Sequence, residues 1–450
     1  MELSFLWNKM NIFGTSKRHL PKSKTMSFGR LVRETSSAML TITLSIVNVV
    51  LGKDKEEMTL KIDDLPIEII AHIFTFLSAK DLNVVSSVCR RFYEATLLES
   101  IWIIRCRKDF NVPIKKFSGF LYRDLYTKVL YQYRSLIGLW QSDVPSYGGL
   151  LEVKFENGKL IGTQLYPPQD PYINRPLRRK PLFSIGIDSN DEKIVLCTVC
   201  ENSHKAEVEM KENNEFHFKC LDIDTHKSPN SRHQALIDWL VEETADALDL
   251  PQFPRSQELL LMKYLILEQY KYNCKFHRIN CPTTQRNVPI QPGLFKGTYG
   301  AHGLEIIILQ YEDCGTKATA FKVSGDPNVP AGQVTFQVDL SYPMVLAPEQ
   351  QQQMALLDEL KVFRMSPSLS LNLPAQPFHL PVDCYERYRQ IPRMCTSRYH
   401  ALGQIAGQGF INPSFSRGHW IIFNEDLFGF LWLDLLSLSM YHRVQNLCTT

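Results

Sequence analysis

The apolar pattern of residues 61–106 constrains the fold of this chain more than any other feature of the sequence. Pro66 follows an acidic pair and marks a helix start, because a proline in the first helical turn loses no backbone hydrogen bond. Behind it, apolar residues recur at steps of three and four, which predicts a helix with one buried face. A break at residues 78–81 separates it from two further predicted helices. A segment this short buries only part of its aliphatic surface internally, so we expect the remainder to bind a partner protein.

The same segment carries a specific set of residues in a fixed order: Leu65, Pro66, Glu68, Ile69, Ile70, Ile73, Phe74, Phe76, Leu77, Asp81, Leu82, Val88, Cys89, Arg90, Arg91, Phe92 and Trp102. This set resembles the F-box family. The resemblance implies docking to the Skp-type adaptor of a cullin-RING ubiquitin ligase. The implied adaptor-binding residues are Leu65, Pro66, Ile69, Ile73, Leu77, Leu82, Val88 and Cys89. The alternative is that the three predicted helices belong to the core of a larger helical domain.

Composition limits the partners and the compartment of the chain. At 450 residues it is long enough for two or three domains. Its net charge of +3 is close to neutral at this size, so neither a nucleic-acid nor a membrane partner is expected. The 11 cysteines are an odd number without an obvious secretory signal. We therefore expect reduced thiols or metal ligands in a cytoplasmic and nuclear protein.

Residues 1–60 are expected to be a disordered leader. A basic region precedes an apolar run at residues 38–52, which is too short to span a bilayer, since a spanning helix needs about 20 residues. A transit peptide is one alternative. Another is that translation begins at Met26, Met39 or Met58.

The remainder of the chain predicts an α+β fold. Residues 107–135 are expected to form a helical stalk, because their apolar residues are spaced for one buried face. Short alternating segments in residues 136–348 and 378–446 predict an antiparallel β-barrel that binds substrate. A helical hairpin is expected at residues 233–272, and a flexible insertion that is rich in proline and glutamine at residues 349–377.

One hairpin can be located closely, and one motif suggests a different function. Asn157 and Gly158 separate two alternating segments and favour a tight turn between paired strands. Gly138 and Trp140 are spaced as near the first strand of lipocalins, so a barrel that binds a small apolar ligand is the alternative function.

Sequence patterns typical of enzymes are not found. The chain has no Gly-x-Ser-x-Gly elbow, no His-Glu-x-x-His motif, no Walker loop and no Gly-x-Gly-x-x-Gly after a predicted strand. Gly297, Gly300 and Gly303 are regularly spaced, but no Lys-Ser or Lys-Thr follows to hold a phosphate, so we expect them to mark close backbone approaches or strand bulges. We therefore expect a non-catalytic protein, with a metal-dependent hydrolase as a remote alternative.

A group of cysteines and histidines predicts a structural zinc site. Cys197, Cys200, His204, Cys220 and His226 supply five candidate ligands where zinc needs four. Cys197 and Cys200 have the usual bidentate spacing, with Cys220 and His226 as the opposite pair; a set of Cys197, His204, Cys220 and His226 also meets the requirement. The alternative is chance proximity of buried thiols and surface histidines. A closed four-ligand site has no open position for water, so it would not indicate catalysis.

Long segments of the chain are similar to the F-box only protein 31 family; these are residues 138–141, 147–151, 180–183, 263–264, 292–300, 302–305, 325–333 and 428–430. The resemblance implies a substrate receptor of a ubiquitin ligase, acting in protein degradation in the cell cycle and the DNA damage response. Its β-barrel would capture C-terminal tails, including those of D-type cyclins and of proteins ending in an amide. The family also binds zinc in the order Cys, His, Cys, His. His204, Cys220 and His226 fit that order, but Cys197 lies one residue closer than the family pattern, which leaves Cys197 and Cys200 open.

A pocket for a terminal amide needs acceptors for its two N–H groups and a donor for its carbonyl. A buried aspartate would accept from an amide and repel a carboxylate. Together with the family resemblance, this chemistry makes Asp326 the principal candidate substrate-binding residue, with Lys322, Tyr299 and His302 as further candidates. The alternative is that Asp326 caps a turn before Pro327.

Overall fold

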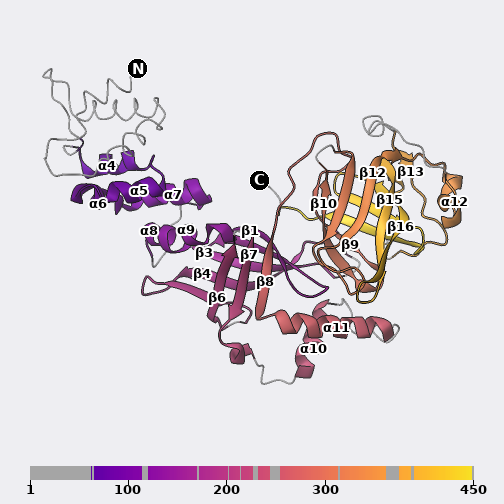
Figure 1. Cartoon of the computed structure of the whole chain (residues 1–450), viewed down its shortest axis with the longest axis horizontal. Helices are drawn as coiled ribbons and strands as arrows, with labels where there is room; N and C mark the ends of the chain where they lie inside the picture. The colour runs from indigo at the N-terminus through magenta and orange to yellow at the C-terminus, as the bar shows by residue number, and fades with distance from the viewer. Residues whose placement is uncertain are drawn as a thin grey trace, which may run out of the picture. The chain divides into compact units, whose positions relative to one another are not determined.

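A computed structural model describes the chain in two compact units (Figure 1). One unit comprises residues up to 134 together with 186–193, and the other comprises residues 135–185 together with 194–450. The leader expected at residues 1–60 lies outside the described residues. Described residues are 62, 65–113, 120–169, 172–200, 202–212, 214–226, 232–243, 254–312, 315–360, 374–386 and 390–447.

Short helices build the first unit. They are α4 (Ile67–Phe74), α5 (Ala79–Ser86), α6 (Arg90–Thr96) and α7 (Glu99–Phe110), so this segment has four helices where three were predicted. The predicted second helix is interrupted at Cys89, which is extended, with φ −155° and ψ 165°. Its Sγ accepts a hydrogen bond from Phe92 N and caps α6. The break was not predicted because Val88 and Cys89 continue the helical spacing of apolar residues across it.

The four helices pack around a small apolar core. Ile70, Phe74, Val85, Phe92 and Ile101 are buried. The rings of Phe74 and Phe92 meet edge to face, with their centroids 5.3 Å apart.

Much of the predicted stalk is helical, although residues 114–119 lie outside the described part. A continuous helical stretch consists of α8 (Tyr122–Asp124), the π-helix η2 (Leu125–Leu130), α9 (Tyr131–Tyr133) and the 3-10 turn η3 (Arg134–Leu136). Leu125, Val129 and Leu130 are buried, as the spacing predicted, but Leu121, which the same spacing placed on the buried face, is 54% exposed.

Eight antiparallel strands form a closed barrel in the second unit. Strand β1 pairs with β8 and closes it. Asn157 and Gly158 have positive φ angles of 49° and 82°, as a hairpin turn between β2 and β3 requires, which confirms that prediction. The strands are β1 (Gly138–Ser142), β2 (Leu150–Glu156), β3 (Lys159–Tyr166), β4 (Arg178–Ile187), β5 (Lys193–Cys197), β6 (His204–Glu212), β7 (Glu215–Cys220) and β8 (Asn273–Ile279).

A second closed barrel follows, so the single predicted barrel is a pair of barrels. Strand alternation could not reveal this, because both barrels have the same pleat and only the pairing of β8 with β1 ends the first one. The strands are β9 (Gly293–Thr298), β10 (Leu304–Tyr311), β11 (Lys317–Lys322), β12 (Val334–Pro343), β15 (Ser397–Gly407), β16 (Ile411–Ile422), β17 (Leu427–Trp432) and β18 (Ser437–Arg443).

Aromatic side chains fill the second barrel, among them Phe336, Trp420, Phe428 and Tyr441. Glycine is required beside them: a Cβ at Gly297 would lie 2.2 Å from the Tyr441 ring. The expectation of a close approach is therefore confirmed for Gly297, whereas a Cβ at Gly300 or Gly303 would meet nothing within 4 Å.

The connections carry the remaining elements. Between β7 and β8 lie the 3-10 turn η4 (Ile223–His226) and the predicted helical hairpin, formed by α10 (Arg232–Glu243) and α11 (Pro254–Tyr270). Between β12 and β15 lie η7 (Pro348–Gln351), α12 (Met354–Asp358) and the short pair β13 (Gln376–Pro377) and β14 (Met394–Cys395). Residues 361–373 of the predicted flexible insertion lie outside the described part.

Two further findings concern the length of the helices and the state of one cysteine. None of the helices in the described residues is long and apolar enough to cross a membrane. The expectation of reduced thiols is wrong for Cys281, which is disulfide-bonded. Pairing of thiols depends on which segments the fold brings together, and the cysteine count does not show this.

Candidate functional site

Three charged side chains are buried together at one end of the second barrel. Glu305 on β10 and Lys322 on β11 point to the same side as the apolar core residues of their strands, and Asp326 follows in the next loop. The Nζ atom of Lys322 lies 2.5 Å from Asp326 Oδ2 and 2.7 Å from Glu305 Oε2. Each residue is at most 3% exposed. An aromatic interior therefore ends in a compact ionic cluster.

The cluster holds one more titratable carboxyl group than it has lysines, and the two carboxyl groups titrate differently. Burial raises the pKa of Glu305 well above its usual value, and the Lys322 charge only partly opposes this. Burial would also raise the pKa of Asp326, but Lys322 and His302 hold it well below its usual range. The same lysine therefore favours the ionised form of Asp326 more effectively than that of Glu305.

Asp326 also organises its own loop. Its Oδ1 accepts hydrogen bonds from Asn328 N at 2.6 Å and from Val329 N at 3.0 Å. The turn-capping role that the sequence left open as the alternative is thus confirmed. It does not compete with a binding role, because the same carboxylate lines a cavity.

The other two predicted residues lie beside this cluster. Tyr299 presents its ring to Lys322, whose Nζ is 4.1 Å from the ring centroid. His302 sits in the 3-10 turn η6 (Gly300–His302), with Nε2 3.8 Å from Asp326 Oδ1. The structure therefore brings Asp326, Lys322, Tyr299 and His302 together. Their role in substrate binding stays a prediction.

Sequence reasoning missed Glu305 as a member of the cluster. The available signal was a single acidic residue in an otherwise apolar strand, since residues 304–309 read Leu-Glu-Ile-Ile-Ile-Leu. Such a carboxyl group needs a buried partner.

A small cavity of about 60 Å³ opens beside the cluster. Its walls come from both barrels and from helix α11, and Glu243 of α10 also lines it. The lining residues are Tyr147, Gly148, Gly149, Leu165, Tyr166, Pro167, Glu243, Leu259, Leu260, Lys263, Leu267, Ala301, His302, Leu304, Glu305, Ser324, Gly325 and Asp326.

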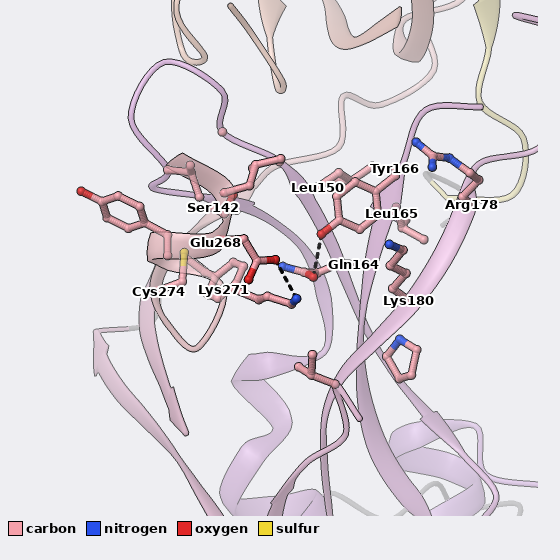
Figure 2. A pocket seen from close by; sticks show the side chains of 18 of the residues that line it. Ser142, Leu150, Gln164, Leu165, Tyr166, Arg178, Lys180, Glu268, Lys271 and Cys274 are labelled. Carbon is pink, nitrogen blue, oxygen red and sulfur yellow. Dashed lines mark hydrogen bonds and ion pairs between the residues drawn. The ribbon is translucent and has the colours of Figure 1, made fainter. Parts of the chain in front are cut away.

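A larger cavity of about 260 Å³ shares six of these residues, so the two cavities adjoin. The shared residues are Gly148, Gly149, Leu165, Tyr166, Glu243 and Leu267. Figure 2 shows Tyr166, Arg178 and Lys180 in the wall of the larger cavity, with Lys271 beside Glu268.

Glutamates form ion pairs with the arginine and lysine side chains that line this larger cavity. The Nη2 atom of Arg178 lies 2.8 Å from Glu243 Oε2, and Lys180 Nζ lies 2.5 Å from Glu242 Oε2. Lys271 Nζ lies 2.7 Å from Glu268 Oε1.

A separate cluster fits a metal ion. One donor atom from each of Cys197, His204, Cys220 and His226 lies within 4.8 Å of the others. The Nε2 atom of His204 is 3.1 Å from Cys220 Sγ and 2.9 Å from His226 Nε2. These separations are close to those between the ligands of a tetrahedral zinc ion, and two sulfurs with two imidazoles are a usual donor set.

The geometry distinguishes between the two candidate cysteines. Cys197 Sγ lies 3.5 Å from Nε2 of His226, the nitrogen that faces the cluster. Cys200 Sγ lies 2.7 Å from Nδ1 of the same ring, on its other side. The fold thus brings together Cys197, His204, Cys220 and His226, and it leaves Cys200 on the other side of the His226 ring. Strands β5, β6 and β7 supply Cys197, His204 and Cys220, and η4 supplies His226.

The predicted adaptor-binding residues differ in exposure. Leu65, Leu77 and Leu82 are buried within the first unit, so they act on a partner only by shaping the surface. Ile69 and Ile73 are partly exposed. Pro66, Val88 and Cys89 are exposed, and 41% of Val88 is accessible.

Comparisons with known proteins match two segments of the chain, one of which contains these predicted adaptor-binding residues. Residues 62–108 match the family described as F-box-like, and residues 276–447 match the Cyclin D1 binding domain. F-box only protein 31 of Rattus norvegicus is 34% identical over 429 residues, which cover 85% of this chain and 84% of the rat protein. The protein of that name from Mus musculus is 35% identical over 429 residues, which cover 85% of this chain and 84% of the mouse protein. The protein from Homo sapiens is 33% identical over 448 residues, which cover 85% of this chain and 83% of the human protein.

Proposed function

We propose, on the premise that this chain belongs to the F-box only protein 31 family, that it captures the C-terminal ends of proteins and presents them for ubiquitination. F-box proteins are substrate receptors of cullin-RING ligases, and this chain also carries a cyclin D1 binding domain. The proposed substrates are tails like those of D-type cyclins and proteins that end in an amide. The proposed compartments are the cytoplasm and the nucleus.

The F-box would bind the Skp-type adaptor, and through it the cullin and RING subunits. Pro66, Val88 and Cys89 offer exposed surface for this contact, and Ile69 and Ile73 offer partly exposed surface. The chain itself would perform no covalent chemistry. It would raise the rate of ubiquitination by holding the substrate near the loaded enzyme, as a high effective concentration does.

The buried ionic cluster beside the small cavity is the observation that carries the tail-capture proposal. A cavity of about 60 Å³ suits the end group of a chain, and the adjoining larger cavity can take the residues before it. Asp326 provides a carboxylate in the cavity wall, as a terminal amide requires of an acceptor.

The charges of the small cavity favour a neutral end group. Lys322 is already paired with Asp326 and Glu305, and Lys263 Nζ lies 2.6 Å from Glu243 Oε1. A terminal carboxylate that entered would find these ammonium groups neutralised, and an unpaired buried charge is costly. A terminal amide carries no charge. The proposed preference is therefore for the amide.

A structural zinc at Cys197, His204, Cys220 and His226 completes the proposal. The ion would supply the energy that joins strands β5, β6 and β7 to turn η4. The Tyr272 ring stacks on His226, with centroids 3.9 Å apart, and its neighbour Lys271 lines the larger cavity. The metal site would thus also hold one wall of that cavity in place.

The lipocalin-like alternative has less support. In the first barrel Phe216 lies 4.7 Å from Trp140 and 4.8 Å from Phe276 between ring centroids, so aromatic rings occupy its interior. These rings take up the space that an apolar ligand would need.

A reconstituted ligase tests the proposal. The chain is assembled with the Skp-type adaptor, cullin and RING subunits and is offered one reporter protein in two forms, ending in a primary amide or in a free acid. We expect faster ubiquitination of the amidated form, and no ubiquitination of either form when the chain is left out. Equal rates for the two forms would contradict the preference, and failure to assemble would contradict the receptor role.

A further inference from the structure

Two buried polar groups line the small cavity without hydrogen-bond partners. They are the hydroxyl of Tyr147 and the carboxyl of Glu305, and within the described residues neither receives or donates a hydrogen bond through its side-chain oxygens. Lys322 Nζ lies 2.7 Å from Glu305 Oε2, but Oε1 has no such neighbour. Buried polar groups normally make hydrogen bonds, so two unpartnered groups on one cavity indicate that a molecule bound in the cavity supplies their partners.

The two groups come from different barrels. Tyr147 lies in the loop between β1 and β2, and Glu305 is on β10. Tyr147 is 6% exposed and Glu305 is 2% exposed. Burial, together with the nearby carboxyl groups of Asp326 and Glu305, raises the pKa of Tyr147 to about 12, so its hydroxyl keeps its proton.

The Tyr147 loop is fixed against the loop that carries Asp326. Gly325 N donates to Tyr147 O at 2.9 Å, and Ala331 N donates to Ser146 O at 2.9 Å. Gly148 has a positive φ of 57°, and a Cβ there would lie 2.4 Å from the Ala331 Cβ. These contacts hold the backbone of the two loops in one conformation. The two unpartnered groups therefore face a preorganised cavity, which favours binding of a ligand of complementary shape.

We propose that Tyr147 and Glu305 bind the terminal amide directly: the Tyr147 hydroxyl donates to the amide carbonyl, and a Glu305 carboxyl oxygen accepts an amide N–H. This inference rests on the proposed function, since it identifies the groups that read the end of the captured chain. It assigns Asp326 a supporting part, because Oδ1 already accepts two backbone N–H groups and Oδ2 faces Lys322.

The position of Glu305 fits this role. Its Oε2 faces Lys322 Nζ at 2.7 Å, and its Oε1 is buried at the cavity without a hydrogen-bond partner among the described residues. An acceptor oxygen beside a phenol donor suits an amide, whereas a terminal carboxylate offers no N–H to Glu305.

The test uses the full chain bound to the adaptor and three peptides of one sequence, ending in a primary amide, a methyl ester or a free acid. The ester keeps a carbonyl acceptor but lacks N–H. We expect Tyr147→Phe to weaken binding of the amide and the ester alike, by roughly three- to tenfold, the usual effect of one hydrogen bond. Glu305→Leu should weaken the amide by a similar factor and leave the ester unchanged.

Two further variants control for structure. Glu305→Gln keeps an acceptor oxygen and should recover most of the amide affinity lost in Glu305→Leu. Tyr311→Phe removes a buried hydroxyl that donates to Ile290 O at 2.8 Å, outside the residues that line either cavity, and should leave all three affinities unchanged. Thermal unfolding of each variant shows whether it is folded.

The outcomes separate this inference from the proposed function. If the wild-type chain does not prefer the amide, the proposed function fails. If it prefers the amide and both Tyr147→Phe and Glu305→Leu keep the wild-type affinity for the amide while folded, only this inference is overturned, and the two groups bind enclosed water. Loss of the preference in Glu305→Gln as well would overturn the role of an acceptor oxygen at this position.

Discussion

The ammonium group of Lys322 lies 2.5 Å from the carboxylate of Asp326, and both side chains are almost wholly buried. The pair joins the end of strand β11 to the loop that follows it. Breaking one partner of a buried pair leaves the other charge without compensation. Removing either charge is therefore expected to alter both the charge of the cavity wall and the conformation of the loop that forms it.

Replacing Asp326 should alter binding without unfolding the barrel. In Asp326→Asn the Oδ1 bonds to Asn328 N and Val329 N can persist, but Lys322 loses its ionised partner. We expect about tenfold weaker binding of an amidated peptide, because the uncompensated charge of Lys322 disturbs the cavity wall that Asp326 supports. Fluorescence anisotropy with amide and acid peptides measures this. Asp358→Asn, at an exposed pair with Arg417, is the matched control. Affinities that are the same for both peptides and unaffected by the change would count against the pocket.

Replacing a metal ligand should lower stability. Cys220→Ser removes one of the four gathered donors, so we expect loss of bound zinc and a melting temperature lower by about 5 °C or more. Metal analysis and thermal unfolding measure both. Cys200→Ser is the control, because Cys200 contacts the other nitrogen of His226 and should retain the metal. A chain that contains no metal, with an unchanged melting temperature in Cys220→Ser, would end the zinc proposal.

Replacing an exposed F-box residue should weaken binding of the adaptor without changing binding of the peptide. Val88→Asp places a charge on a side chain that is 41% exposed, and we expect adaptor recovery to fall more than tenfold while peptide affinity stays the same. Val382→Asp, on a side chain that is 84% exposed in the second unit, is the control. Pulldown of purified adaptor measures the effect. Undiminished recovery with Val88→Asp would show that the adaptor binds elsewhere.

Buried His419 should make the second barrel sensitive to acid. Its Nδ1 accepts a hydrogen bond from Arg398 Nη2 at 2.8 Å, and burial with the Arg398 charge holds its pKa well below the usual value. The folded state therefore binds fewer protons than the unfolded state below about pH 6.5, so stability falls as the pH drops. The slope reaches at most about 1.4 kcal/mol per pH unit for one proton.

Urea unfolding at pH 7 and pH 5 measures this loss. His419→Gln supplies an uncharged acceptor to Arg398 and should show a smaller loss over the same interval. An identical loss in both proteins would assign the acid sensitivity to other groups, such as His400, whose pKa is also lowered by burial.

Sequence and structure agree most closely where local chemistry determines the outcome. The Asn157 and Gly158 turn, the start near Pro66 and the close approach at Gly297 each depend on a few neighbouring atoms, and each is confirmed. The four residues proposed for the pocket also meet in space, although their role is untested.

Features that depend on distant pairing were not predicted. The division into two barrels depends on β8 returning to β1. Strands β15 and β18 were also missed; each pairs with an adjacent strand and with one that lies farther along the chain, β12 and β9 respectively. Glu305 was missed as a functional group because its partners, Lys322 and Asp326, are brought to it only by the fold. The choice of Cys197 over Cys200 likewise needed the orientation of the His226 ring.

The most direct measurement is the affinity of the wild-type chain, bound to its adaptor, for two peptides that differ only in a terminal amide or a terminal acid. A cavity whose lysines are already paired should bind the amide at least about tenfold more tightly, since this corresponds to about 1.4 kcal/mol. Equal binding of the two peptides, or tighter binding of the acid, would contradict the proposal that this site selects an uncharged chain end.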